Sequence, residues 1–459
     1  RSRPLPSEGP GRGRDAAYVH DGLPWPDEVV AHPRIVTAGG AGTAPLEAHR
    51  VIVASSMRAI SGVDVFAATL VRGLSARGID ARLHGRALPV TEGTPVLPSD
   101  LPYDQRDPAL DDDYLGWVNR WGRMIAHLER LAPCIYVPNC DSDFSCICPR
   151  LPAGVRVVGI GHSDDPWHYE HLNRIAHGCD AIVGVSDAIS NHLRSLAPRF
   201  ASRVETIPYG IPAHSAPAME SAAEDVFDGL RIIYSGRLVA RQKRVFDLVA
   251  MARALESRGV PYEMIIVGEG DDRRAMERAA RDLVLRRRVW FAGIQPYDGL
   301  VELMQKADVF LLPSAFEGLS LSMLEAMSRG VVPVVSDVRS GGADLIVPGV
   351  NGFVVPVGDI AAYADRLEWL WKHPAERECM AKATMATIDA GYRADRMVDR
   401  YVDLFRRIVA SPIARPMGPI APPRHLAPEL TWSLWASRVA ADPAASLRRV
   451  ARRFIRPPR

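Results

Sequence analysis

The chain has 459 residues, too many for a single hydrophobic core, because domains usually contain about 100–200 residues. Hydrophobic residues make up 47% and charged residues 24%, which is ordinary for a globular protein and excludes a mostly disordered or fibrous chain. No stretch approaches the roughly 18 consecutive apolar residues of a membrane span. We therefore expect two domains with appended segments.

The net charge of +2 is unevenly distributed along the chain. Residues 412–459 contain nine arginines against Glu429 and Asp442, so this tail carries +7 and the rest of the chain carries −5. The basic tail predicts an acidic partner. The six cysteines are too sparse for a disulfide framework in a chain of this length, which predicts a reducing, cytoplasmic environment.

Regular structure is expected after residue 47, because residues 1–47 are rich in Pro, Gly and Arg without periodicity and predict a loosely ordered arm. The apolar run at 49–55 predicts a strand, and helical spacing over 63–78 predicts a helix after a small polar loop. The next predicted strands are 155–160, 181–185 and 203–207, with a helix beginning at Ser186. This alternation predicts a parallel sheet with helices on both faces.

A second alternating series begins at Arg231. Its predicted strands are the run RIIYSG from Arg231 and the runs at 263–267, 289–292, 308–312 and 331–335. Its predicted helices are 244–258, 271–283, 299–306 and 321–329, and from about Ile360 the chain is expected to be helical through 390–409.

The expected fold is α/β, with two doubly wound, Rossmann-like parallel-sheet domains facing each other across a cleft. The predicted division is an arm at 1–47, an N-terminal domain at 48–213, a hinge linker at 214–228, a C-terminal domain at 229–390, a bracing helix at 391–411 and a basic tail at 412–459. Ligands of such sheets bind beyond the carboxyl ends of the strands. We therefore expect the chemistry in the loops that follow the strands.

Three of these loops carry signals of different strength. Gly236 and Arg237 end a predicted strand and Lys243 opens the next helix, so two cations beside a helix N-terminus predict a phosphate site. Taken alone, such a pair is more often solvated. The loops at 267–270 and 291–294 contain glycines, which let a ligand approach the backbone or simply make a turn.

The loop at 313–320 is more specific. Ser320 is expected to cap the helix that follows it, leaving free N–H groups that face the cleft. Glu317 lies in the loop and Glu325 in the helix, so both can reach one ligand. The alternative is a solvated Glu317 and a Glu325 that pairs with Arg329 at i,i+4.

At these residues the chain resembles a known family. The run FLLPSAFEGLSLSMLEAMSRGVVPVVSD, with GRLVARQKR upstream, VGEG between them and GVNGFVVPVGD afterwards, is similar to the retaining nucleotide-sugar glycosyltransferases of GT-B fold. That superfamily includes glycogen synthases and many bacterial mannosyl- and glucosyltransferases. The resemblance covers about 50–409 and is strongest over 231–358, and its E-x7-E element is Glu317 and Glu325.

The resemblance implies a role for each matching residue. Arg237 and Lys243 would neutralise the donor diphosphate. Glu317 would bind the hydroxyls of the donor sugar, and Glu325 those of the ribose. Main-chain contacts to the donor are implied for Gly236, Ile294, Gly318, Leu319, Ser320 and Leu321, with Ile294 at the nucleobase.

Two further matches lie in the N-terminal half. The segment Ile60-Ser61-Gly62-Val63-Asp64 resembles the family's first glycine loop, G-G-x-E, and implies a diphosphate contact at Gly62. Ser61 replaces one glycine and Asp64 replaces the acid. His162 matches a histidine placed near the donor sugar, and a core or capping histidine is the alternative.

The implied reaction moves a hexose from a UDP- or GDP-linked sugar to a hydroxyl of a glycan, lipid or small molecule, with retention of configuration. No metal and no cofactor are expected, because the two cations and a helix N-terminus stabilise the charge of the leaving diphosphate. Retention implies that the leaving phosphate takes the acceptor's proton. The predicted partners are the nucleotide sugar and the acceptor, and no nucleic acid.

Three alternatives remain open. The pattern at 141–143 and the run at 111–113 are acidic and of a kind that metal-dependent glycosyltransferases use. A nucleotide-sugar epimerase of the same fold needs no acceptor. A non-catalytic nucleotide-sugar-binding protein is compatible with the altered first glycine loop.

The tail predicts an amphipathic helix. Leu447, Val450, Ala451 and Phe454 recur at helical spacing, five arginines occupy the other faces, and two tryptophans precede them. One interpretation is contact with an anionic membrane surface through residues 431–459. The other is a solvated or docking helix.

Overall fold

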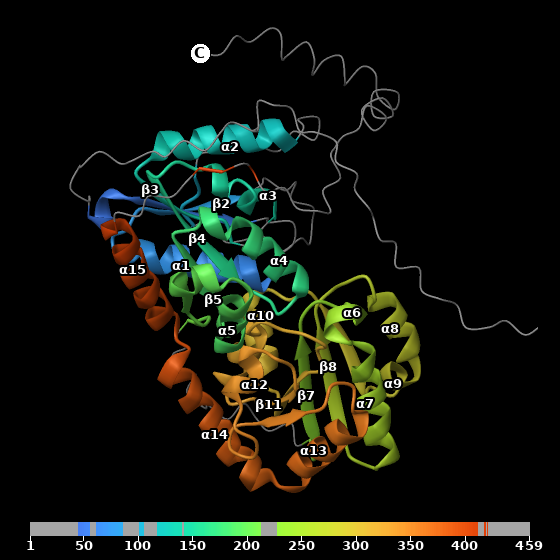
Figure 1. Cartoon of the computed structure of the whole chain (residues 1–459). Coiled ribbons are helices and arrows are strands. Elements are labelled where there is room, and N and C mark those ends of the chain that lie inside the picture. Colours follow the sequence, from blue (N-terminus) through green and yellow to red (C-terminus); the bar gives the residue numbers. More distant parts are fainter. Residues whose placement is uncertain are drawn as a thin grey trace, which may run out of the picture. The chain divides into compact units, whose positions relative to one another are not determined.

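A computed structural model describes residues 45–55, 61–85, 101–104, 117–139, 142–212 and 227–411, together with 417, 418 and 420. These residues form two six-stranded sheets flanked by helices (Figure 1). Every pairing between neighbouring strands is parallel. The predicted α/β fold with two doubly wound parallel sheets is confirmed.

The first sheet has the order β2-β1-β3-β4-β5-β6. Its strands are β1 (Arg50–Ser55), β2 (Ala81–Gly85), β3 (Cys134–Val137), β4 (Val155–Gly161), β5 (Ala181–Gly184) and β6 (Val204–Thr206). The α-helices of this half are α1 (Gly62–Ser75), α2 (Trp117–Leu131), α3 (Ser142–Ser145), α4 (Pro166–Ile175) and α5 (Asp187–Leu196).

The second sheet has the order β12-β11-β10-β7-β8-β9. Its strands are β7 (Leu230–Ser235), β8 (Tyr262–Val267), β9 (Val289–Gly293), β10 (Val309–Leu312), β11 (Val332–Ser336) and β12 (Phe353–Val355). The helices of this half are α6 (Ala240–Lys243), α7 (Phe246–Ser257), α8 (Arg273–Ala279), α9 (Arg281–Leu285), α10 (Tyr297–Gln305), α11 (Leu321–Met327), α12 (Gly341–Leu345), α13 (Ile360–Lys372) and α14 (Pro374–Gly391). The last helix, α15 (Ala394–Ala410), packs on the first half.

The pleat of β7 explains why its sequence is a continuous apolar run. Ile232 and Tyr234 face the hydrophobic cluster that includes residues of α7 and α13, whereas Ile233 faces the opposite cluster. A central parallel strand is buried on both faces, so both sets of alternate residues are apolar. The predicted strands of the second half all lie within a residue or two of the observed ones.

Several expectations about helices and strands were wrong or incomplete. The single helix predicted at 271–283 divides at Ala280 into α8 and α9. The helix predicted to reach Arg329 ends at Met327, because Gly330 adopts a left-handed conformation that closes the helix. Three strands were not predicted: β2, β3 and β12, which are only five, four and three residues long.

The chain returns to the first half after α14. Ile211 pairs with Arg393, and α15 then packs along α1 (Figure 1). The predicted hinge and tail lie almost wholly outside the described residues, at 213–226 and 421–459. The described helices include none with the length and hydropathy needed to cross a membrane. The domain boundaries drawn from the sequence stay a prediction.

Candidate active site

The glycine-containing loops of the second sheet are joined by main-chain hydrogen bonds. The Gly236 N–H donates to the Val267 carbonyl at 3.1 Å, and the Gly268 N–H donates to the Gly293 carbonyl at 2.8 Å. Gly268 has a φ of 131°, and a Cβ there would collide with the Gly236 carbonyl. Three signals that are weak in the sequence are therefore joined at the carboxyl ends of β7, β8 and β9.

A buried ion pair joins the loops after β7 and β10. Lys243 Nζ lies 2.6 Å from Glu317 Oε1, and the two side chains are only 13% and 9% exposed. The loops are also joined through the main chain, because the Ala315 N–H donates to the Gln242 carbonyl at 2.8 Å. The predicted phosphate-binding cation and the predicted sugar-binding acid are thus direct partners.

Arg237 is held beside this pair. Its Nη2 donates to Gln242 Oε1 at 2.6 Å, and its carbonyl accepts a hydrogen bond from the Tyr234 hydroxyl at 2.8 Å. The Gln242 side chain also donates to the Phe316 carbonyl at 3.4 Å. Gln242 therefore links Arg237 to the loop of Glu317. Sequence reasoning missed Gln242, although it stands directly before Lys243 within the family-like run.

Glu325 is buried within α11. The predicted cap of this helix is confirmed, since the Met323 N–H donates to Ser320 Oγ at 3.3 Å. Burial raises the pKa of the Glu325 carboxyl to about 7, although the positive charge of Arg329 acts in the opposite direction. Arg329 donates through Nη1 to the main-chain carbonyl of Glu325 at 2.7 Å. The Glu325 carboxyl therefore changes between its protonated and ionised forms near neutral pH.

The two halves of the protein meet at Gly318. Ser163 and Gly318 form an antiparallel bridge, and the Asp164 N–H donates to the Glu317 carbonyl at 3.3 Å. A Cβ at position 318 would collide with the His162 carbonyl, so only glycine fits. The loop after β4 thereby fixes the main chain that carries Glu317.

His162 has both ring nitrogens occupied by protein groups. Nε2 lies 2.7 Å from Asn139 Oδ1, which can only accept, and Nδ1 lies 2.5 Å from the Tyr209 hydroxyl. Burial lowers the pKa of the imidazole to about 3, so the ring is neutral. Asn139 also donates to the Val63 carbonyl at 3.2 Å. The ring is therefore buried within the first half, and it is the His162 carbonyl that contacts Gly318 of the second half.

Ser61 and Asp64, the two residues that differ from the pattern of the first glycine loop, contact each other at the start of α1. Asp64 is buried and accepts hydrogen bonds from the Ser61 N–H at 2.8 Å, from Ser61 Oγ at 2.7 Å and from the Ser55 hydroxyl. Ser61 and Asp64 thus form a capping box at the start of α1. Gly62 faces Leu321, since a Cβ there would lie 3.5 Å from Leu321 Cδ1. The two loops predicted to meet the donor are therefore neighbours.

The remaining predicted residues are those at 318–321 and Ile294. Leu319, Ser320 and Leu321 are buried, and Gly318 accepts a hydrogen bond from the Gly341 N–H at 2.8 Å. Ile294 follows β9 and is 44% exposed. The structure thus brings Gly62 and His162 of the first half beside Leu321 and Gly318 of the second.

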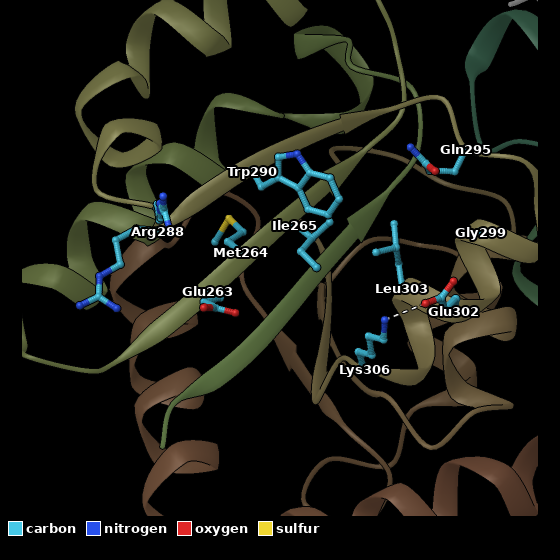
Figure 2. Close-up of a pocket in the computed structure, with 11 residues that line it drawn as sticks. Glu263, Met264, Ile265, Arg288, Trp290, Gln295, Gly299, Glu302, Leu303 and Lys306 are labelled. Atoms are coloured by element: carbon cyan, nitrogen blue, oxygen red, sulfur yellow. Dashed lines mark hydrogen bonds and ion pairs between the residues drawn. The ribbon is translucent and has the colours of Figure 1, made fainter. Parts of the chain in front are cut away.

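A separate groove of about 570 Å³ lies between β8, β9 and α10 (Figure 2). Trp290 and Leu303 line it, and Lys306 pairs with Glu302 at 2.7 Å along one side. It contains none of the predicted site residues, although Gln295 at its end directly follows Ile294. Its mixture of opposite charges does not indicate a phosphate ligand.

Each half of the chain matches a family of glycosyltransferases. Residues 60–214 match Glycosyltransferase Family 4, and residues 224–386 match Glycosyl transferases group 1. The alpha-D-kanosaminyltransferase of Streptomyces kanamyceticus is 27% identical, with 71% of this chain and 89% of that protein aligned. The lipopolysaccharide 1,6-galactosyltransferase of Escherichia coli K12 is 32% identical over 40% of this chain. That alignment spans 49% of the relative's length, and the chain likewise spans about half of several other curated relatives.

Solved structures share the fold. Sucrose-phosphate synthase from Thermosynechococcus elongatus superposes with a TM-score of 0.63 at 19% identity, over 79% of this chain and 99% of that one. The Anabaena protein HepE in complex with UDP-glucose gives a TM-score of 0.60 at 15% identity, over 77% and 98%. The lipopolysaccharide outer core galactosyltransferase WaaB gives 0.57 at 20% identity, over 80% and 100%. Together with the two family matches, this fold shows that the chain belongs to the GT-B glycosyltransferase superfamily.

Proposed function

We propose that the protein transfers a hexose from a UDP- or GDP-linked sugar to a hydroxyl acceptor, with retention of configuration. The observation that carries this proposal is the buried Lys243–Glu317 pair at 2.6 Å, beside Arg237. Two cations and one acid at adjoining strand ends suit a substrate that has a diphosphate on one side and sugar hydroxyls on the other.

The ion pair suits an enzyme in which Lys243 and Glu317 bind each other without the donor and separate to bind the donor. Without the donor, Lys243 and Glu317 neutralise each other in a place that excludes most water. With the donor, the ammonium group of Lys243 would turn to the diphosphate and the carboxylate of Glu317 to the sugar hydroxyls. Each charge then keeps a partner, so the exchange avoids leaving either one buried and alone.

The same cations support a reaction without a metal at the diphosphate. Breaking the bond between sugar and diphosphate adds negative charge to the leaving oxygens, and Arg237 and Lys243 are placed to stabilise it. Because the Glu317 carboxylate would bind the sugar hydroxyls once Lys243 has turned to the diphosphate, we assign it to orientation of the sugar and not to attack on it. We infer that the leaving phosphate takes the acceptor's proton on the same face of the sugar, which retains configuration.

The donor and acceptor classes are supported by the relatives. HepE was solved with UDP-glucose, and the Staphylococcus aureus protein TarM with UDP and alpha-GlcNAc-glycerol. The curated relatives are named for a lipopolysaccharide galactosyltransferase and a kanosaminyltransferase. These names favour a UDP-hexose donor and a glycan or small-molecule acceptor, with GDP sugars as the next candidates.

A ligand panel tests the proposal. Thermal unfolding is followed with UDP, GDP and ADP and with their glucose, galactose and mannose conjugates. A nucleotide at 100 times its dissociation constant adds about 2.7 kcal/mol of stability. The stabilising sugar nucleotide is then followed by NMR with and without glycan acceptors. A product of unchanged anomeric configuration, formed without manganese, supports the proposal. Conversion of the donor alone indicates an epimerase, and binding without any turnover indicates a non-catalytic protein.

We further propose that residues 431–459 bring the protein to an anionic membrane surface on the cytoplasmic side. These residues lie outside the described part of the chain, so the proposal depends on the amphipathic sequence pattern and the net charge of the tail. Deleting residues 419–459 should abolish sedimentation with anionic vesicles at low salt while leaving transfer to a soluble acceptor intact. A full-length chain that does not sediment would show that the helix is solvated or docked.

A further inference from the structure

Two histidines and an aspartate converge in the first half of the protein, away from the residues assigned to the donor. His84 Nδ1 lies 3.2 Å from Asp104 Oδ2, and His127 Nε2 lies 2.6 Å from the same oxygen. One candidate ligand atom from each residue lies within 4.8 Å of the others. The candidate active site uses none of the three.

Three separate segments supply these side chains. His84 is the penultimate residue of β2, where it pairs with Ala54 of β1. The segment before Asp104 runs beside β2, and the Asp104 N–H donates to the Leu83 carbonyl at 3.0 Å. His127 belongs to α2, next to its buried positions Met124 and Leu128. The main chain therefore fixes Asp104 beside His84, and the helix adds the third side chain.

The surroundings exclude most water. The side chains of His84 and Asp104 are each 2% exposed, and the Phe144 ring lies edge-on to His84 with centroids 5.7 Å apart. A buried carboxylate is normally paired or bound to a metal. The His127 side chain is 14% exposed and is the least buried of the three.

We propose that His84, Asp104 and His127 form a binding site for a divalent transition metal ion of the zinc class. Zinc binds imidazole nitrogen and carboxylate oxygen at about 2.0–2.2 Å, so its ligand atoms lie roughly 3.3 Å from one another. The two separations of 2.6 and 3.2 Å lie within about 1 Å of that spacing, and the candidate ligand atoms of the two histidines lie within 4.8 Å of each other.

The three side chains converge on one carboxylate oxygen. Both imidazoles approach the same carboxylate oxygen, so three ligand atoms surround one small region. Two imidazoles and one carboxylate also match the ligand types that zinc takes in proteins. The ion would tie α2 and the segment of Asp104 to the outer strand of the first sheet.

Metal binding to the purified full-length chain tests this site. The protein, freed of any affinity tag and stripped with a chelator, is dialysed against Zn²⁺, and bound zinc is measured by mass spectrometry and by competition with a chromophoric indicator. We expect one ion per chain. Co²⁺ in place of Zn²⁺ should give the visible absorption of a low-symmetry site.

Matched variants separate this site from others. Since loss of an outer partner alone weakens metal binding roughly 10- to 100-fold, His127→Gln and Asp104→Asn should each weaken it by more than about 100-fold. His192→Gln removes a histidine of the same half outside the cluster and should bind zinc like the wild type. His127 decides the test if Asp104→Asn does not fold, because it lies at the partly exposed side of α2.

Two results would overturn the proposal. One is a wild-type chain that retains no stoichiometric zinc after dialysis. The other is a His127→Gln variant that binds zinc as tightly as His192→Gln. Nucleoside diphosphate affinity serves as an independent readout, and it should be the same in wild type and His127→Gln, because the donor site is built from other residues.

Discussion

Gly318 packs its main chain directly against the carbonyl group of His162, and no side chain fits between them. This contact sets the position of Glu317 relative to the first sheet. Gly318→Ala should force the two loops apart, with a loss of stability of about 1–3 kcal/mol. A displacement of about 1 Å can lower turnover roughly 100-fold. Melting temperature and kcat measure the two effects.

Gly391→Ala is the matched control for this variant. A Cβ at position 391 meets no heavy atom within 4 Å, so both stability and turnover should stay close to wild type. A Gly318→Ala protein that matches this control in both measurements would show that the contact with His162 does not constrain the site.

Lys243→Ala should lower both stability and turnover. The substitution leaves the Glu317 carboxylate buried without its partner, which costs on the order of 3 kcal/mol. It also removes a charge that stabilises the leaving diphosphate, which lowers turnover roughly 10²- to 10³-fold. Denaturation and initial rates with the preferred donor measure the two losses.

A double variant distinguishes the two roles of Lys243. Adding Glu317→Gln removes the orphaned charge, so the double variant should regain much of the lost stability while remaining inactive. Lys306→Ala removes a lysine from an exposed pair with Glu302 and should change neither quantity. Recovery of turnover in the double variant would show that Lys243 serves the fold and not the phosphate.

Glu317→Gln and Glu325→Gln should affect different parts of the donor. Glu317 is assigned to the sugar and occupies Lys243 when no donor is bound, so its variant should lose turnover while binding the free nucleoside diphosphate at least as tightly as wild type. Glu325 is assigned to the ribose, so its variant should bind the free nucleotide more weakly. Isothermal titration calorimetry with the nucleoside diphosphate measures both, and equal affinities in the two variants would remove the distinction.

The burial of Glu325 predicts a pH dependence. Its pKa is raised from 4.5 to about 7 in the folded protein, so between these values the folded state holds a proton that the unfolded state has lost. This proton stabilises the fold at acidic pH, and its contribution falls as pH rises towards 7, by an amount on the order of 3 kcal/mol. Glu325→Gln should flatten this part of the stability profile.

Nucleotide binding should change in the opposite direction with pH. If the ribose hydroxyls donate to the ionised Glu325 carboxylate, affinity for the nucleoside diphosphate should rise between pH 6 and 8, and the rise should vanish in Glu325→Gln. Denaturation and calorimetry at several pH values check the two trends together. Parallel profiles for wild type and variant would place the titrating group elsewhere.

The order of strands and helices in the second half could be read from the sequence, and so could the loops that carry Arg237, Lys243, Glu317 and Glu325. Hydrophobic periodicity is a local property, and a loop after a buried strand is recognisable wherever that strand lies in the sheet. The cap at Ser320 is local in the same sense.

The partners of these residues depended on tertiary structure. Lys243 and Glu317 are 74 positions apart and meet because the strand order places β7 beside β10. Gly318 meets His162 because loops from two different sheets adjoin, and His84, Asp104 and His127 converge from three separate segments. No local pattern encodes such distances, because sheet order and the packing of one half against the other are set by the burial of many distant apolar side chains at once.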